Sequence, residues 1–140
     1  MIERRIKDFH SEFLELEDDI SRYTFLIELS AYISTGSAAL MTNDNLWSGC
    51  QSKVWLNVMP YNDTLLIEAT SDTMIIRGIL YVIISLFQDC TVSEIAASQI
   101  DIPEICALKN HFTSKRQSGI ASIIGRIQEI AQKEVMKSIS

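Results

Sequence analysis

The feature that most constrains the fold of this chain is a long apolar run, residues 74–87, in which Arg77 is the only charged side chain. The run is too short to cross a bilayer, which requires about 20 apolar residues. Ser71 and Asp72 precede it, and such side chains favour a helix N-terminus, so we predict a helix over residues 73–88. Because this helix is apolar on nearly every side, it must be buried, and the rest of the chain has to cover it.

Two helices are predicted before this run. Apolar residues recur at steps of three and four along residues 2–16, which is the pattern of an amphipathic helix. Residues 17–19 are acidic, and negative charge favours a helix N-terminus, so a second helix should begin there. Its predicted inner side consists of Ile20, Tyr23, Leu26, Ile27 and Ala31. Residues 34–45 are rich in Ser, Thr, Gly and Asn and predict a loop.

A β-hairpin is predicted after this loop. Residues 54–59 carry valine or leucine at every second position, which is the pattern of a strand with one side toward the core. Residues 60–63, Pro-Tyr-Asn-Asp, favour a turn. Residues 64–69 then predict a second, antiparallel strand.

Helices are predicted again in the second half of the chain. Thr91 and Glu94 have the spacing of a capping box, and Pro103 stands where a first helical position is expected. Thr113 and Ser114 precede a long final helix. The predicted apolar face of that helix consists of Ile120, Ile123, Ile124, Ile127, Ile130 and Ala131.

This order of elements defines the expected fold class. Two helices, two strands and then several helices do not form an alternating β-α-β pattern. The order predicts an α+β fold in which a small antiparallel sheet is packed on one face by helices. At 140 residues, the chain is expected to form a single domain over residues 1–140.

The charge and the start of the chain narrow the classes of function. The net charge of −6, without a lysine or arginine block, argues against nucleic-acid binding. Charged residues continue from Glu3 to Asp19, so no apolar signal core follows Met1, and no segment predicts a membrane span. We therefore expect a cytoplasmic protein with neither a nucleic-acid nor a membrane partner.

Cys50, Cys90 and Cys106 are an odd number of cysteines at wide spacing. The spacing does not match a disulfide framework, and free thiols are expected in a reducing compartment. A zinc site made from the three cysteines and His111 has no support in ligand spacing. Cys90 lies at a predicted helix end and Cys106 among apolar residues, so both are predicted to be buried packing residues.

Cys50 is the main functional candidate. It follows Gly49 at the point where the polar loop turns into the first predicted strand. A cysteine thiolate is a strong nucleophile that can also hold a second sulfur atom. Gly49 lets the backbone turn tightly and leaves one side of the thiol uncrowded. The alternative, that Cys50 is a small buried apolar residue, stays open on these grounds.

The two histidines are weaker candidates. His10 is predicted to be solvated on the first helix, and His111 is predicted to fix a loop by hydrogen bonding. A cysteine hydrolase that pairs Cys50 with His111 fits the chain order, but no third residue is indicated that would orient the histidine.

Four cations lie close to the Cys50 segment or to predicted helix starts. Arg77 must be paired or face the polar edge near the Cys50 loop, because a buried unpaired arginine is costly. Asp72, five residues earlier, is poorly placed on a helix to pair with it. Lys115 and Arg116 begin the last helix, where the helix dipole favours negative charge. Their unfavourable placement indicates a functional role for these two cations. Together with Arg77 and Arg116, Lys53, three residues after Cys50, is a candidate to favour the Cys50 thiolate.

Three spaced blocks of the sequence resemble the SufE-like family of sulfur acceptors in iron–sulfur cluster assembly. The blocks are N-x-x-x-G-C-Q-S-x-V-W over residues 45–55, S-D-x-x-I-I-R-G-I over residues 71–79, and H-F-T-x-x-R-x-x-G over residues 111–119. An earlier segment, Y-x-x-L-I-E-L over residues 23–29, extends the resemblance over nearly the whole chain.

The resemblance implies that Cys50 takes sulfur from the persulfide of a pyridoxal-phosphate cysteine desulfurase, stimulates that enzyme, and passes the sulfur to an iron–sulfur scaffold complex. The chain would then be a sulfur-transfer protein and not an enzyme. It would need no cofactor or metal, because the pyridoxal phosphate belongs to the partner. The resemblance also implies a fold shared with IscU-type scaffolds. The protein is expected to be either a monomer or a homodimer. Partner-binding or loop-supporting roles are implied for Gly49, Gln51, Ser52, Asp72, Arg77, His111 and Arg116.

Some residues depart from the family pattern. They are Trp47, Ser48, Ser114 and Ser118, and they leave open how Cys50 is held at rest. Two alternative functions also stay open. A metal- or cluster-binding scaffold of the same fold is disfavoured because only one cysteine matches the ligand positions of such scaffolds. A cysteine hydrolase is disfavoured by the missing orienting residue.

The strand pattern adds an expectation about Cys50 at rest. If the strand extends back to Cys50, then Cys50, Ser52 and Val54 point toward the same face, which is the core side. A thiol on that side is shielded from oxidants and has to swing out to meet the persulfide of a partner.

Overall fold

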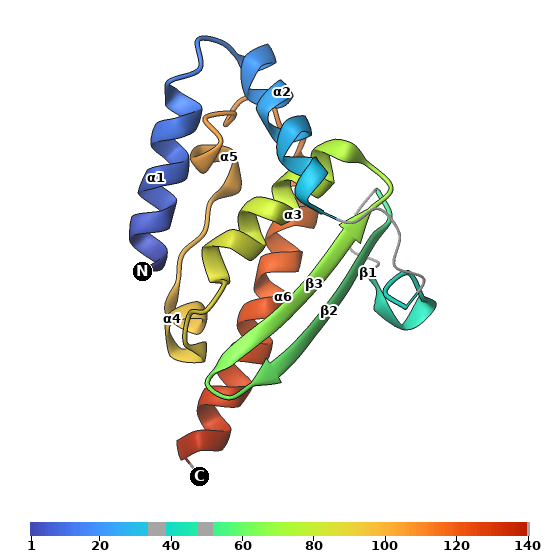
Figure 1. The fold of residues 1–140 in the computed structure, drawn as a ribbon, viewed down its shortest axis with the longest axis vertical. Helices are drawn as coiled ribbons and strands as arrows, with labels where there is room; N and C mark the ends of the chain where they lie inside the picture. Colours follow the sequence, from blue (N-terminus) through green and yellow to red (C-terminus); the bar gives the residue numbers. More distant parts are fainter. Residues whose placement is uncertain (34–38, 48–51, 140) are drawn as a thin grey trace.

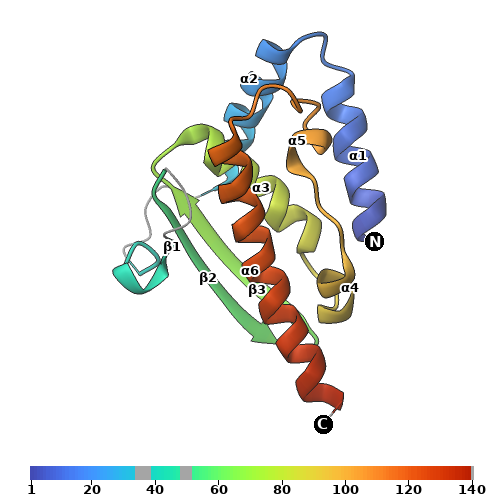
Figure 2. The same cartoon turned by 180° about the vertical axis from the view of Figure 1, so that it is seen from behind.

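The computed structural model describes residues 1–33, 39–47 and 52–139. Within these residues the sheet consists of β1 (Leu46–Trp47), β2 (Val54–Tyr61) and β3 (Thr64–Ser71), in that spatial order. The helices are α1 (Ile2–Leu14), α2 (Asp19–Leu29), α3 (Met74–Phe87), α4 (Val92–Ala97), α5 (Ile102–Ile105) and α6 (Ser114–Ile139), with 3₁₀ turns η1 (Ser30–Tyr32) and η2 (Asn43–Asn45). The long α6 crosses behind the β2–β3 hairpin in Figure 1 and in front of it in the reverse view of Figure 2. The predicted α+β fold, a small antiparallel sheet packed by helices, is confirmed.

The hairpin is longer than the sequence pattern predicted. Pro60 and Tyr61, expected in the turn, belong to β2 and pair with Leu65 and Thr64 of β3. A two-residue turn suffices, because Asn62 adopts a left-handed φ of 55°, which asparagine tolerates well. β3 also continues past the predicted end at residue 69, so the sheet reaches Ser71.

β1 was not predicted. Leu46 pairs with Trp55 and Trp47 pairs with Val54, so β1 extends the sheet beyond β2. Two residues are too few to show an alternating pattern, and the strand is defined only by its pairing with β2. The predicted loop over residues 34–45 contains η2 where it is described, and residues 34–38 lie outside the described part.

The sheet contributes one face to the core. Val54 is fully buried, and Leu56 and Val58 pack against the core, as the alternation predicted. Their partners in β3 are Ser71, Ala69 and Ile67. Helix α3 packs against β3 and helix α6 against β2, so the inner face of the hairpin is covered by helices.

The predicted buried helix is confirmed as α3. Most of its side chains are buried in the core, on nearly all sides of the helix. Gly78 lies where α3 crosses α2, and a Cβ atom built on Gly78 would stand 2.1 Å from the carbonyl oxygen of Leu26. Glycine is therefore required at this crossing because the two backbones approach each other closely.

We expect Gly78→Ala to destabilise the protein by about 1–3 kcal/mol, since the added methyl group collides with backbone that must shift. Gly125→Ala is the matched control, because a Cβ built on Gly125 of α6 meets no atom within 4 Å. The control should be neutral or stabilising, by about 0.5–1 kcal/mol, as helical glycine is costly. Chemical denaturation of both variants measures the two free energies of unfolding, and equal destabilisation would contradict the close approach.

Helix α2 is rotated relative to its predicted orientation. Leu26 is buried and Tyr23 packs against the core, as expected. However, Ile20 is 78% exposed, and Ile27 and Ala31 also face solvent. The buried side instead runs through Leu26 and Leu29, because the contact with α3 at Gly78 fixes which side of α2 faces inward.

The predicted N-terminal signals of α4 and α5 agree with the structure, whereas the predicted cap of α3 does not. The capping box is confirmed: the Glu94 amide donates to Thr91 Oγ1 and the Thr91 amide donates to Glu94 Oε1. Pro103 lies in the first turn of α5, after the N-cap Asp101. The predicted cap of α3 at Ser71 and Asp72 is wrong. The N-cap is Thr73, whose side chain makes no capping bond to the helix, because Ser71 is still part of β3.

Candidate functional site

The candidate site lies where β2 begins and β3 ends. The Ser71 hydroxyl donates to the Lys53 carbonyl at 2.7 Å, and the Lys53 amide donates to Asp72 Oδ1 at 3.2 Å. Thr73 Oγ1 lies 2.9 Å from Ser52 Oγ and 3.0 Å from Asp72 Oδ1. Residues 71–73 therefore fix the backbone and side chain of residues 52–53, which closely follow the motif cysteine in the sequence.

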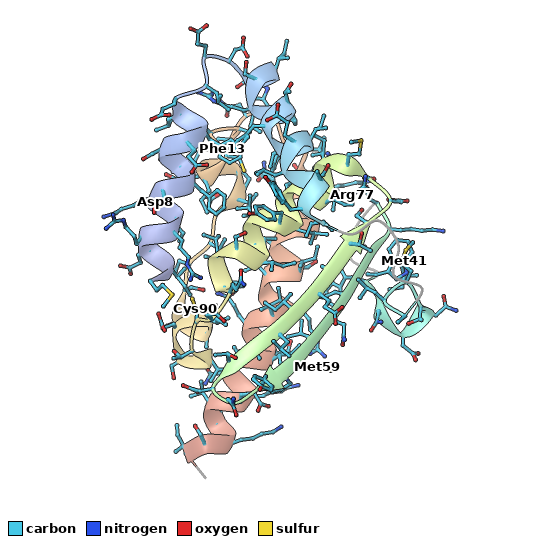
Figure 3. The ribbon with its side chains drawn as sticks, in the orientation of Figure 1. Asp8, Phe13, Met41, Met59, Arg77 and Cys90 are labelled. Atoms are coloured by element: carbon cyan, nitrogen blue, oxygen red, sulfur yellow. The ribbon has the colours of Figure 1, made fainter. Side chains whose placement is uncertain are left out.

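Arg77 supports this corner from α3. Its Nη1 donates to the Ser71 carbonyl at 2.8 Å, so Arg77 contacts the end of β3 and does not pair with Asp72. Its Nε atom is buried and has no hydrogen-bond partner among the described residues. Figure 3 shows Arg77 at the sheet end of α3. The expectation that Arg77 faces the polar edge near the cysteine loop agrees with this geometry.

Two cations from α6 reach the same corner. Thr113 Oγ1 accepts from the Arg116 amide at 3.1 Å and thereby caps the helix whose first turn holds Lys115 and Arg116. These two side chains line a small cavity of about 20 Å³ together with Ser52 and Gly119. The other lining residues are the apolar Ile76, Ile120 and Ile123. The cavity thus combines an apolar wall with positive charge, which favours the thiolate form of a cysteine beside it.

The structure brings together four of the predicted site residues, Ser52, Asp72, Arg77 and Arg116. Gly49, Cys50 and Gln51 lie outside the described residues, so the predictions on them, and on the resting position of the Cys50 side chain, stay predictions.

His111 takes part in a different contact. Its Nε2 lies beside Asp19 Oδ2, and its carbonyl accepts from the Tyr23 hydroxyl at 2.8 Å. It therefore ties the loop before α6 to α2. Burial raises the pKa of Tyr23, and the positive charge of Arg116 opposes this shift, so the contact lies close to the cationic turn of α6.

Three residues of the site were missed. Ser71 and Thr73 flank Asp72 in the sequence, and hydroxyl residues beside a strand end were the available signal. Trp47, a departure from the family pattern, donates from Nε1 to Ser122 Oγ of α6 at 3.1 Å and so fixes the other side of the motif segment. No sequence pattern connects residues 47 and 122, since only the tertiary fold brings them together.

The described thiols are buried. Cys90 and Cys106 are both fully buried in the core, as predicted for packing residues. Burial raises the pKa of the Cys106 thiol to about 12 and also raises the pKa of Cys90. His10, predicted to be solvated, is half-buried, and its Nδ1 lies 3.3 Å from the Ile105 carbonyl because α5 packs on α1.

The described residues hold no cluster with the chemistry of a metal site. No group of three or more His, Cys, Asp or Glu side chains among them is arranged to hold a metal ion. None of the helices in the described part of the chain has the length and apolarity needed to span a membrane.

The fold and the site define a class: small α+β domains in which a Gly-Cys segment leads into the hairpin. A solved structure with the same fold is the solution structure of a hypothetical protein from Thermus thermophilus. It has a TM-score of 0.72 and covers 94% of this chain and 96% of its own, at 13% sequence identity. At that identity the likeness shows the fold alone.

The chain belongs to the SufE family. The family model, described as an Fe-S metabolism associated domain, matches residues 7–131. Uncharacterized SufE-like proteins of Rhizobium etli and Rhizobium meliloti are each 31% identical over 126 residues, which cover 86% of this chain and 85% and 90% of theirs. The cysteine desulfuration protein SufE of Wigglesworthia glossinidia brevipalpis is 28% identical over 134 residues, covering 93% and 92%. The suspected family is thereby confirmed, and with it a role in sulfur transfer for iron–sulfur metabolism.

Proposed function

We propose that this chain accepts a sulfur atom from a cysteine desulfurase onto Cys50, stimulates that enzyme by removing its bound sulfur, and passes the sulfur to an iron–sulfur cluster scaffold. Family membership and the cysteine desulfuration protein among the relatives support the proposal. The observation that carries it is the position of Ser52, two residues after Cys50, in a cavity lined by Lys115 and Arg116.

The transfer needs little from the protein beyond an accessible thiolate. The Cys50 thiolate attacks the outer sulfur of the donor persulfide, a new sulfur–sulfur bond forms at Cys50, and the donor cysteine leaves as a thiolate. The electrons balance without an oxidant or a reductant. Lys115, Arg116 and Lys53 supply the positive charge that favours the Cys50 thiolate and stabilises the persulfide anion.

The other two thiols are poorly suited to this reaction. With a pKa of about 12, Cys106 is protonated at neutral pH, and burial keeps a partner away from it. Cys90 is likewise buried, with a raised pKa. Because the thiolate is the reacting species, neither thiol competes with Cys50 in the folded protein.

In this proposal the chain is a carrier with a covalent intermediate and not an enzyme in its own right. It requires no cofactor, because the pyridoxal phosphate belongs to the desulfurase partner. The transfer takes place in the cytoplasm between protein partners.

The direct test is to incubate the protein with a pyridoxal-phosphate cysteine desulfurase and cysteine, and to map sulfur by mass spectrometry under non-reducing conditions. We expect a mass gain of one sulfur atom on the peptide that contains Cys50, together with faster alanine production by the desulfurase. The positive control is the same desulfurase with a small-molecule thiol acceptor. If that control reacts while the protein gains no sulfur on any cysteine, the proposed function is rejected.

The resting position of Cys50 gives a separate prediction. Ser52 lines the inner cavity and Val54 is buried, but β2 begins at Val54 and Ser52 lies in a bend before it, so the strand does not extend back toward Cys50 as the parity argument assumed. The inward position of Ser52 alone leads us to predict a shielded Cys50 thiol. In a time course with iodoacetamide, we expect Cys50 of the free protein to be labelled more slowly than in an unfolded control, and faster once the desulfurase is bound. Labelling of the free protein at the rate of the unfolded control would show that no outward movement is needed.

A further inference from the structure

The side of the sheet that faces away from α6 carries a group of apolar side chains, of which all but the half-buried Trp55 are exposed. We call it the outer face, and it consists of Leu46, Trp55, Met59, Tyr61 and Leu66. Leu46 pairs directly with Trp55, and Met59 pairs with Leu66, so each pair lies on one face of the sheet. Leu46 is 39% exposed, Met59 49%, Tyr61 59% and Leu66 47%. Figure 3 shows Met59 on the hairpin, toward its turn.

This concentration distinguishes the outer face from an ordinary surface. Single exposed apolar residues are normal on proteins, whereas neighbouring ones on adjacent strands mark a surface that binds another molecule. The face runs along β2 from Trp55 to Tyr61, which is about 20 Å at the rise of a strand. A patch of this length can form one part of a standard protein–protein interface, which buries about 800 Å² of surface on each partner.

The charges on the outer face indicate what kind of partner fits. Glu68, which is exposed and pairs with Asn57, lies between the two apolar pairs. Asp44 and Asp63 are exposed at the two ends of the face. A second copy that met this face about a two-fold axis would bring Glu68 toward Glu68, and an anionic membrane would also repel it. The complementary partner is a protein whose apolar contact residues are accompanied by lysine or arginine.

The position of the outer face points to one such partner. The end of the outer face formed by Leu46 and Trp55 is nearest in the sequence to the segment that contains Gly49 and Cys50. This is because β1 and β2 are the elements that precede and follow residues 48–51. A protein that reaches Cys50 therefore stands next to this end. We propose that the outer face is a docking surface for the cysteine desulfurase, with basic residues of the desulfurase opposite Glu68. This inference rests on the proposed function and names the surface that the partner uses.

The test compares two variants of the face with a matched control in a titration of desulfurase activity. The variants are the double substitution Met59→Ser with Leu66→Ser, and the single substitution Glu68→Lys. The control is Ile20→Ser, because Ile20 is a large apolar residue on α2 that is even more exposed. Each protein is titrated against the desulfurase with cysteine in excess, and thermal unfolding confirms that each is folded.

We expect the double variant to raise the concentration for half-maximal stimulation about tenfold, as loss of a central apolar contact does. Stimulation at saturation and persulfide formation on Cys50 should be unchanged, because the reacting groups are untouched. Glu68→Lys should raise the same concentration several-fold, and added salt should shrink its difference from the natural protein, since the effect is electrostatic. Ile20→Ser should titrate like the natural protein.

The outcomes separate the two proposals. If the natural protein accepts sulfur and the face variants titrate like it, the docking surface is rejected and the proposed function stands. If the natural protein neither accepts sulfur nor stimulates, both are rejected. A dimer that the double variant converts to a monomer would assign the face to a second copy, and binding to vesicles of anionic lipid would assign it to a membrane; either result overturns the proposal. Should the double variant fail to fold, Glu68→Lys alone decides.

Discussion

Replacing Cys50 by serine is expected to abolish sulfur acceptance completely. Serine has nearly the same shape, but its hydroxyl is not ionised at neutral pH and forms no persulfide. The loss should appear in mass spectrometry as absence of the added sulfur on every peptide. It should also appear as a return of desulfurase activity to the rate without acceptor, a far larger change than any surface substitution would cause.

The remaining cysteines provide the controls for this result. Cys90→Ala and Cys106→Ala remove thiols that are fully buried, so these variants should lose some stability but retain sulfur acceptance when folded. Circular dichroism establishes that they are folded before the assay. Full acceptance by Cys50→Ser, or loss of acceptance in either folded control, would show that the sulfur is carried elsewhere.

Charge reversal at Arg116 is expected to have the second-largest effect. In Arg116→Glu the cavity beside Ser52 loses a positive charge and gains a negative one, and in the proposed function the Cys50 thiolate forms two residues before Ser52 in the sequence. The persulfide anion is then disfavoured, and a partner surface that meets Arg116 is repelled. We expect desulfurase stimulation to fall about tenfold or more, which corresponds to about 1.4 kcal/mol.

Arg126→Glu is the matched control for this substitution. Arg126 is also half-buried on α6 and lies ten residues further on, about 15 Å along the helix, where it contacts Glu129. It should therefore leave stimulation unchanged. Asp72→Arg, on the other side of the site, should change stimulation as well, because Asp72 holds the Lys53 amide. Unchanged stimulation in both Arg116→Glu and Asp72→Arg would count against a role of this corner in sulfur transfer.

Local signals in the sequence were sufficient for the elements that carry their own pattern. The apolar run became α3, the alternating residues became β2, and Thr91 and Glu94 formed the capping box. The rotation of α2 was not predictable in this way, because Ile20 and Ile27 have the same periodicity as the residues that are buried. It is set by the contact between Gly78 and Leu26, which joins residues far apart in the chain.

The candidate site shows the same division. The motif blocks identified Ser52, Asp72, Arg77 and Arg116, and the structure places these four around one corner of the sheet. His111 belongs to a block as well, yet it contacts Asp19 and Tyr23. A block in a sequence does not reveal which of its residues reach the site, since neighbouring positions at the start of a helix point in different directions.

The contacts on either side of the motif have a consequence for how sulfur travels. Trp47 is fixed to Ser122, and Ser52 lies against Thr73, so residues 48–51 join two held positions. A chain spans at most about 3.6 Å per residue, so a reactive group two residues from an anchored position can move only about 7 Å away from it. Such a short tether cannot carry cargo between distant sites as a long swinging arm does. In the proposed function, the carrier therefore has to leave the donor and diffuse as a whole to the recipient.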